Sequence, residues 1–480
     1  MASHLISDMA RTVALPFLKR AAGGITRWVP IPQPTLMIGP GASARLGELL
    51  NDLGHQKLFI VTDAVVVGLG LLAPLTDALR RGGTAFEVFD EITPDAPIPL
   101  VELGIARFKQ AQCDAIVAVG GGSVMDAAKA IGLAAANHKH PRELVGYFRG
   151  RHAPPPLYAV PTTAGTGSEV TVAAVIADPE HQRKLVIADT RLVPRIAALD
   201  PALMTGLPGP VTAATGMDAL THAVEAYLSQ WATPFTDQMA LAAVGLIYQN
   251  LPIAFHDGHN LLAREKMALA STWAGLAFTR ANVGNVHAIA HQLGAWYHTP
   301  HGLANAIMLP PVLRFCSGAV AGRLATLAVR AGVGRAGEPE AALAQAFIDS
   351  VEAMNRRLGL PRQLDALREA DIPALAQAAC READLGYPVP RVMSHANCEA
   401  LLREVLPNPA HARPVVRAVA RPAARTARTK TPQPASVASK PTTPRPRAAK
   451  ASPAIKPPPT SDTVLMSAGK PSSSGRRPRR

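Results

Sequence analysis

The chain has 480 residues, of which 48% are hydrophobic and 18% charged, enough for two or three domains with buried cores. Its formal net charge is +14, and the excess of positive charge lies in residues 406–480. That segment holds 16 Lys and Arg residues and one acid, a net charge of +15, so the other 405 residues together carry −1. The net charge is therefore no sign that the body of the protein binds nucleic acid or membranes. The four cysteines form no CxxC pair, which argues against a disulfide framework and a thiolate metal site and favours a cytoplasmic location.

Residues 1–33 form a leader ahead of the first predicted strand. Asp8 and Arg11 precede a very short apolar run without a convincing cleavage site, so we expect an amphipathic helix rather than a signal peptide. We expect no transmembrane segment, because Asp126 and Lys129 interrupt the best candidate.

Residues 34–208 alternate short β-rich runs with helical ones. The predicted strands are KLFIVTD (57–63), DAIVAVGGGS (114–123), LYAVPTT (157–163), LVIAD (185–189) and IAALD (196–200). The stretch LGLLAPLTDALRRGG (69–83) is expected to be one helix that ends at glycine. Strands that alternate with helices predict an α/β, Rossmann-like domain with a mostly parallel sheet.

Residues 209–405 are Ala/Leu-rich and helical in pattern, and they predict an all-α second domain that carries the metal and substrate sites. Expected interruptions are HDGHN (256–260), TPHG (299–302) and LPPV (309–312). Residues 406–480 contain fifteen prolines and no aromatic residue. Such a segment cannot bury enough apolar surface to offset its conformational entropy, so we expect a disordered basic tail.

Two loops with phosphate-binding chemistry follow predicted strands. Gly120, Gly121 and Gly122 join a strand to a helix, where backbone N–H groups and the helix dipole favour a pyrophosphate. A tight turn explains these glycines equally well. The second loop, PTTAGTGSE (161–169), offers the hydroxyls of Thr162, Thr163 and Thr166. If the two strands are neighbours in a parallel sheet, their loops border one ligand-binding crevice.

Asp63 ends the first of these strands. An acid at this position can accept hydrogen bonds from the adenosine ribose and would repel a 2′-phosphate, which favours NAD over NADP. The alternative is a helix N-cap, a common use of Asp.

Histidines are concentrated in HAIAHQLGAWYHTPH (287–301). His287 and His291 are four residues apart and face the same way on a helix, but Ala288 replaces the catalytic Glu of HExxH, so a metalloprotease is unsupported. Upstream, Asp218 and His222 have the same spacing. One Asp with three histidines suits Fe²⁺ or Zn²⁺, although spacing alone leaves open which histidines bind.

These stretches together resemble the iron-containing (group III) alcohol dehydrogenases over roughly residues 34–405. The matching blocks, in order, are GGGSVMDAAK, PTTAGTGSEVT, GMDALTHAVEAY, AREKMALASTWAGLAFTRA and VHAIAHQLGAWYHTPHGLANAIMLP. The resemblance implies a Rossmann-like domain, a helical domain, and a metal ion and nicotinamide in the cleft between them.

The resemblance also implies which residues bind the metal and the cofactor. The implied metal ligands are Asp218, His222, His287 and His301, with His291 beside the substrate as a proton relay and no role for His298. The implied cofactor contacts, with Lys184 at the nicotinamide ribose, are Asp63, Gly121, Gly122, Ser123, Asp126, Thr162, Thr163, Thr166 and Lys184. Asp95 stands where the family often has Asn, which places an acid near the adenine side.

The expected activity is reversible hydride transfer between an alcohol and NAD at Fe²⁺, with Zn²⁺ as an alternative metal. Within the same superfamily, a polyol dehydrogenase or a maleylacetate-reductase-like enzyme is the nearest alternative. From another class, residues 406–480 could tether the protein to nucleic acid or another polyanion, and a solvated extension is the simpler interpretation. The family suggests a homodimer or higher homo-oligomer. The residues Trp273, Phe278, Trp296 and Tyr297 either line an alcohol pocket or belong to the core.

Overall fold

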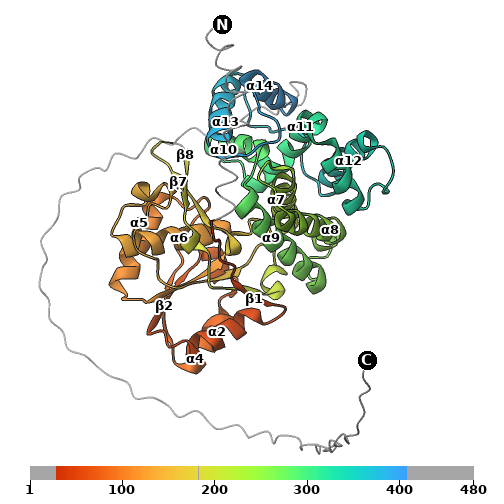
Figure 1. The fold of residues 1–480 in the computed structure, drawn as a ribbon. Coiled ribbons are helices and arrows are strands. Elements are labelled where there is room, and N and C mark those ends of the chain that lie inside the picture. The colour runs from red at the N-terminus through yellow and green to blue at the C-terminus, as the bar shows by residue number, and fades with distance from the viewer. Residues whose placement is uncertain (1–28, 182, 408–480) are drawn as a thin grey trace, which may run out of the picture. The chain divides into compact units, whose positions relative to one another are not determined.

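The computed structural model describes residues 29–181 and 183–407 (Figure 1). The predicted basic tail, apart from residues 406 and 407, and the predicted leader helix lie outside the described residues. The first region of the chain has the predicted α/β organisation. Its strands are β1 (Thr35–Ile38), β2 (Lys57–Val61), β3 (Ala85–Phe89), β4 (Ala115–Gly120), β5 (Gly146–Tyr147), β6 (Leu157–Pro161), β7 (Ala173–Asp178), β8 (Arg183–Ala188) and β9 (Ile196–Leu199). Its helices are α2 (Ala42–Asp52), α3 (Ala64–Gly68), α4 (Ala73–Gly82), α5 (Ile98–Gln110) and α6 (Gly122–Asn137).

Six strands form one sheet in the order β1-β9-β6-β4-β2-β3, and all of its pairings are parallel. The apolar run AIVAVG of β4 is buried at every position, as expected for a strand covered on both faces. In this order β3 lies on one side of β2 and β4 lies on the other side. The direction in which successive strands are added therefore reverses between β2 and β4. Open α/β sheets bind ligands at the carboxyl ends of strands beside such a reversal.

Two details differ from the sequence-based expectation. β8 lies outside the main sheet, in a three-stranded sheet with β5 and β7, where β7 and β8 are antiparallel. Buried residues alternate along β7, which is the pattern of a sheet with only one covered face. The helix expected over 69–83 begins only at Ala73, as α4, because Gly70 adopts a left-handed φ of 69° in the turn that separates α4 from the preceding α3.

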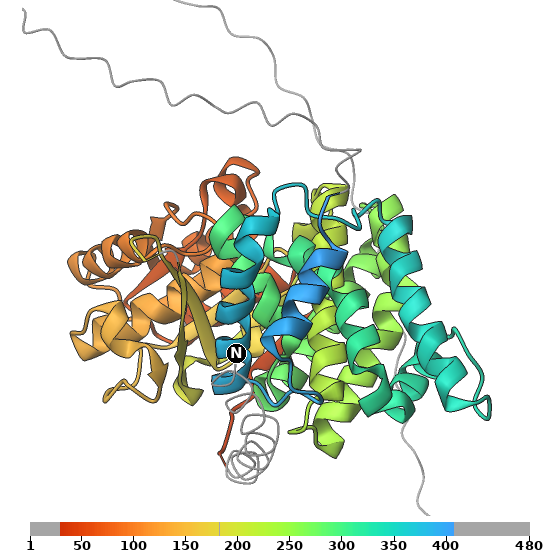
Figure 2. The ribbon, with the colours of Figure 1, turned by 90° about the horizontal axis from the view of Figure 1, so that it is seen from above.

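The second region is helical, as predicted. Its helices are α7 (Gly209–Leu228), α8 (Pro234–His256), α9 (Leu261–Ala281), α10 (Asn285–Tyr297), α11 (His301–Ala331), α12 (Glu340–Arg357), α13 (Ile372–Gly386) and α14 (His395–Glu404). We propose the division between the two regions at residues 208 and 209, where α7 begins. Figure 2 shows the helical region, green to blue, beside the α/β region, red to yellow.

The predicted interruption at LPPV is wrong, because α11 continues through Pro310 and Pro311. A proline inside a helix leaves the carbonyl four residues earlier without its usual donor. For Pro310 that carbonyl belongs to Ala306, and the side-chain amide of Asn355 donates to it at 2.6 Å. The backbone leaves helical geometry later, at Val320, where φ is −137°.

Two helices, α8 and α11, are long and apolar enough to cross a membrane by length and composition alone. Each packs against other helices of the same region, α8 against α7 and α9, and α11 against α7 and α12. This is how core helices of a globular domain behave, and neither helix is a clear membrane span.

Candidate metal centre and cofactor cleft

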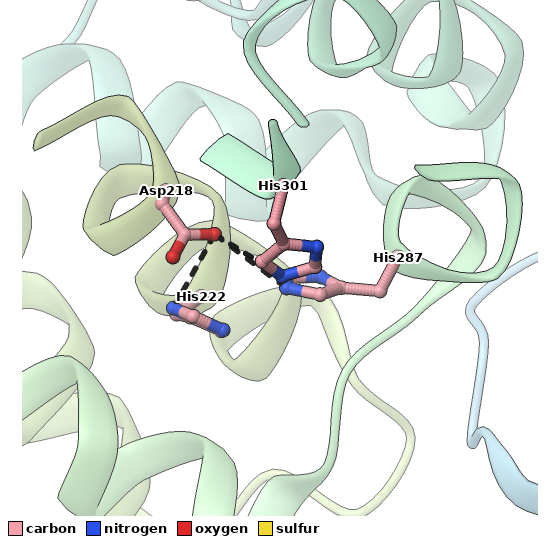
Figure 3. Close-up of side chains that lie close together, drawn as sticks. All are labelled: Asp218, His222, His287 and His301. Atoms are coloured by element: carbon pink, nitrogen blue, oxygen red, sulfur yellow. Dashed lines mark ion pairs between the residues drawn. The ribbon is translucent and has the colours of Figure 1, made fainter. Parts of the chain in front are cut away.

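Four side chains from three helices converge in the helical region. Asp218 and His222 lie one turn apart on α7, His287 lies in the first turn of α10, and His301 begins α11. One oxygen of Asp218 is 4.0 Å from His222 Nδ1, 3.9 Å from His287 Nε2 and 3.6 Å from His301 Nε2 (Figure 3). The four ligand atoms lie within 4.8 Å of one another. These separations exceed hydrogen-bond lengths and suit groups arranged around a common centre.

The protonation states of these histidines fit a divalent metal. Burial lowers the pKa of His222 to about 4, against the attraction of Asp218, and burial together with neighbouring imidazoles holds the pKa of His301 well below its usual range. Both rings are therefore neutral at neutral pH, which a metal ligand requires. His222 Nδ1 is buried without a hydrogen-bond partner, although its ring also bonds to the backbone of Gly165. The lone pair on His222 Nδ1 is therefore available to bind Fe²⁺ or Zn²⁺.

Three residues that the sequence analysis did not single out contact this group or the neighbouring His291. Glu225 Oε2 lies 2.6 Å from His287 Nδ1. The amide nitrogen of Asn305 lies among the proposed ligand atoms, 2.7 Å from Asp218 Oδ1, 3.2 Å from His287 Nε2 and 3.3 Å from His301 Nε2. The sequence spacing could have indicated the first two of these residues. Glu225 lies seven residues after Asp218, and Asn305 lies four residues after His301, so each shares a helix face with a proposed ligand. The third residue, Glu382, comes from α13, and no local pattern predicts its contact.

His291 lies on the same helix as His287 but outside the group of four. Its ring stacks on that of His301, with centroids 5.2 Å apart, and its Nδ1 is 2.6 Å from Glu382 Oε1. Tyr387 donates its hydroxyl to the same oxygen at 2.6 Å. Burial would raise the pKa of Glu382, but His291 and these hydrogen bonds hold that pKa below its usual range. A carboxylate therefore fixes the His291 ring beside the proposed metal ligands.

The two predicted cofactor loops meet at the carboxyl ends of β4 and β6, which are adjacent as expected. Thr162 donates its backbone N–H to the Gly120 carbonyl at 3.0 Å. A Cβ on Gly122 would lie 2.5 Å from Thr166 Cγ2, so only glycine allows this approach. Gly121 begins α6 with no side-chain cap, which leaves the N–H groups of its first turn available to an anion.

Asp63 follows β2 at the same edge of the sheet and also caps α3. Its Oδ1 accepts the N–H groups of Val65 and Val66, both at 2.9 Å. The alternative N-cap role is therefore present in the structure. The cap does not use Oδ2, so a ribose contact through that oxygen is compatible with it.

A buried lysine ties the two cofactor loops together. Lys129 Nζ, from α6, donates to the carbonyls of Ser168, Thr171 and Ala173 and to the hydroxyls of Ser168 and Thr171, at 2.7–3.0 Å. Burial lowers its pKa to about 8, against the attraction of Asp126, so the ammonium is protonated at neutral pH. Lys129 belongs to the quoted block GGGSVMDAAK, but the sequence analysis gave it no role.

Asp126, which the resemblance implies as a cofactor contact, also hydrogen-bonds to residues that follow β6. Its Oδ1 accepts the Ser168 hydroxyl at 2.7 Å, and its Oδ2 accepts the Val175 N–H at 3.0 Å. Burial raises the pKa of this carboxyl despite Lys129 nearby. In the structure Asp126 therefore supports the loop, and direct contact with a cofactor stays a prediction.

Asp95, the acid expected near the adenine side, pairs with a predicted cofactor residue, and its position relative to the adenine stays a prediction. Asp95 Oδ1 pairs with Lys184 Nζ at 2.9 Å, and its backbone N–H donates to Ser123 Oγ at 3.0 Å. Lys184 reaches from β8 toward α10, where a Cβ on Gly294 would lie 3.7 Å from its Nζ. Asp95 therefore lies between the glycine loop and the metal-bearing helices. The loop before α5 turns it there, with a φ of 67° at Asp95.

One of the four aromatic candidates contacts the proposed ligands. Phe278 stacks on His222, with ring centroids 4.2 Å apart. Tyr297 donates its hydroxyl to Asp371, and Trp296 is largely exposed. Among the described residues, Phe278 is therefore the aromatic side chain best placed to border a substrate at this centre.

Comparisons with known proteins agree with this arrangement. Residues 33–201 match the family described as iron-containing alcohol dehydrogenase, and residues 212–406 match its C-terminal domain. The chain is 40% identical over 370 residues to the 1,3-propanediol dehydrogenase of Klebsiella pneumoniae, covering 76% of this chain and 95% of the relative. It is 40% identical over 348 residues to the NAD-dependent methanol dehydrogenase of Bacillus methanolicus, covering 72% and 91% of the two chains. A crystal structure of 1,3-propanediol oxidoreductase superposes with a TM-score of 0.76 at 39% identity, covering 79% of this chain and all of that one.

Proposed function

Because the chain belongs to the iron-containing alcohol dehydrogenase family, we propose that it catalyses the reversible NAD-dependent oxidation of a small alcohol to an aldehyde or ketone. The observation that carries this proposal is the convergence of Asp218 with His222, His287 and His301 in a chain whose two predicted cofactor loops follow the adjacent strands β4 and β6. A divalent metal held by these four residues would supply a Lewis acid that lowers the pKa of a bound alcohol.

The residues around the metal group bind and orient the reactants. The N–H groups at the start of α6 and the hydroxyls of the second loop would hold the pyrophosphate, and Asp63 the adenosine ribose. Lys184 is placed to contact the nicotinamide ribose, next to Asp95. The contact of His291 Nδ1 with Glu382 leaves Nε2 to accept the alcohol proton and pass it toward solvent.

We further propose a short primary alcohol or diol as the substrate, because the relatives include a 1,3-propanediol dehydrogenase and a methanol dehydrogenase. The test is NADH formation from NAD and a panel of short alcohols, diols and longer polyols, with maleylacetate reduction assayed in parallel. Turnover of short alcohols and diols supports the proposal. Exclusive turnover of polyols or of maleylacetate would favour the alternative enzymes and contradict it.

Replacing Asp63 with Ser should relax the preference for NAD. Serine is a good N-cap, so α3 keeps its cap while the carboxylate that repels a 2′-phosphate is lost. We expect the ratio of kcat/KM for NADP over NAD to rise roughly tenfold or more, equivalent to about 1.4 kcal/mol. Steady-state kinetics with both cofactors measures this. Asp52→Ser, at an exposed position of α2, is the control, and an unchanged ratio in Asp63→Ser would remove Asp63 from the ribose site.

Residues 406–480 carry the charge that supports the alternative class of function. A chain that ends at residue 407 should keep its kcat/KM, because the proposed metal ligands and cofactor loops lie before it. If the tail binds polyanions, the full chain is retained on immobilised DNA in a salt-dependent way and the shortened chain is not. Equal elution of the two chains would identify the tail as a solvated extension.

We also propose that the protein forms a homo-oligomer and that it is located in the cytoplasm. Family resemblance supports the first, and four cysteines without disulfides support the second.

A further inference from the structure

We propose that Glu225 is a positioning residue of the metal centre, which holds the His287 imidazole so that its Nε2 faces the metal. Glu225 lies on α7, 7% exposed, and its Oε2 is 2.6 Å from His287 Nδ1. The opposite ring nitrogen, Nε2, is the one that faces Asp218. The inference rests on the proposed function, because it requires His287 to be a metal ligand.

The contact selects one form of the imidazole. A neutral histidine carries a proton on one ring nitrogen and a lone pair on the other, and a carboxylate can only accept. Glu225 therefore keeps the proton of His287 on Nδ1 and the lone pair on Nε2. With the proton on Nε2, His287 could not bind a metal from its present orientation. Carboxylates that bond to metal-binding histidines orient the ring and increase its basicity in this way.

The carboxylate is itself fixed at the start of α10. Glu225 Oε2 accepts the Gly284 N–H at 2.8 Å, and Oε1 accepts the Val286 N–H at 2.7 Å. A negative charge is favourable at this end of a helix. A Cβ on Gly284 would lie 2.7 Å from Oε1, so the close approach depends on glycine. Glu225 thus joins α7, which bears Asp218 and His222, to the helix that bears His287.

The same helix provides a matched control. Glu382 Oε1 lies 2.6 Å from His291 Nδ1, the same distance and the same pair of groups. His291 is not one of the four converging residues. Replacing Glu382 with Gln therefore makes the same change, from a carboxylate to an amide, beside a histidine that is not a proposed ligand.

The test is Zn²⁺ affinity, measured on the metal-stripped full chain by competition with a chromophoric chelator. We expect Glu225→Gln to bind Zn²⁺ about 10–100-fold more weakly than the wild type, and Glu382→Gln to bind it with unchanged affinity. His287→Ala is measured alongside. If His287→Ala loses Zn²⁺ while Glu225→Gln keeps wild-type affinity, the role of Glu225 is wrong and the metal site stands. If His287→Ala also keeps wild-type affinity, the metal site itself is wrong.

A second measurement does not depend on the folding of a Glu225 variant, which matters because Glu225 also bonds to the backbone of α10. NMR of the metal-stripped wild-type chain with isotope-labelled histidine reports which ring nitrogen of His287 carries the proton. The signal is assigned by its absence from His287→Ala. A proton on Nδ1 is the expected result, and a neutral ring protonated on Nε2 would overturn the proposal.

Discussion

His287→Ala should abolish metal binding and reduce NAD-linked turnover by roughly three orders of magnitude or more. A metal that stabilises developing charge contributes several kcal/mol, and each 1.36 kcal/mol corresponds to a factor of ten in rate. The metal-free fold should survive, because Glu225 still accepts the N–H groups of Gly284 and Val286 at the start of α10. Metal content, steady-state kinetics and far-UV circular dichroism measure the three effects.

His298→Asn is the matched control, a second histidine of the same segment. His298 ends α10 with a left-handed φ of 53°, and its backbone N–H donates to the Gly294 carbonyl. Asparagine tolerates this backbone conformation, so metal content and turnover should stay at wild-type levels. If His287→Ala keeps both as His298→Asn does, His287 is not a ligand.

Lys129→Met should lower the free energy of unfolding by about 3–5 kcal/mol, the range for breaking a buried charged network by removing one partner. Methionine matches the length of lysine but leaves the carbonyls of Ser168, Thr171 and Ala173 without this donor. The loop that carries Thr162, Thr163 and Thr166 would lose its tie to α6, so NAD affinity should fall as well. Urea unfolding and NAD titration measure the two effects.

Lys57→Met is the control that shows how much stability is lost when a lysine outside this network is replaced. Lys57 pairs with Glu87 at 3.3 Å in a partly exposed position, where an ion pair contributes at most about 1 kcal/mol. A loss of the same size in both variants would show that the Lys129 network is not the cause.

The α/β region was predictable because its signals are local. A buried strand such as AIVAVG and the glycines that follow it define both an element and a loop. The alternation of strands and helices predicted a parallel sheet, and the structure showed that β4 and β6 are neighbours in it. The strand predicted over 185–189 exists as β8, but its place in a second sheet was not predictable, because a short apolar run does not reveal which strand it pairs with. The LPPV error has a similar origin, since the amide that satisfies Ala306 comes from Asn355, 49 residues away.

The metal group was partly readable from the sequence. Helical spacing placed Asp218 beside His222 and His287 beside His291, but it left the choice among histidines open, and the family resemblance made that choice. The supporting residues divide in the same way. Glu225 and Asn305 continue helix faces already identified, whereas Glu382 reaches His291 across 91 residues. The pairing of Asp95 with Lys184 could not be predicted, because it depends on a left-handed backbone turn at Asp95 and on a strand of another sheet.

The most direct test of the account combines metal analysis of anaerobically purified protein with NAD-linked oxidation of short alcohols and diols. We predict stoichiometric iron or zinc, activity that is lost on chelation, and recovery of that activity when Fe²⁺ is added back. Full activity in protein that has been thoroughly stripped of metal would contradict the account, because the group formed by Asp218, His222, His287 and His301 would then have no part in the reaction.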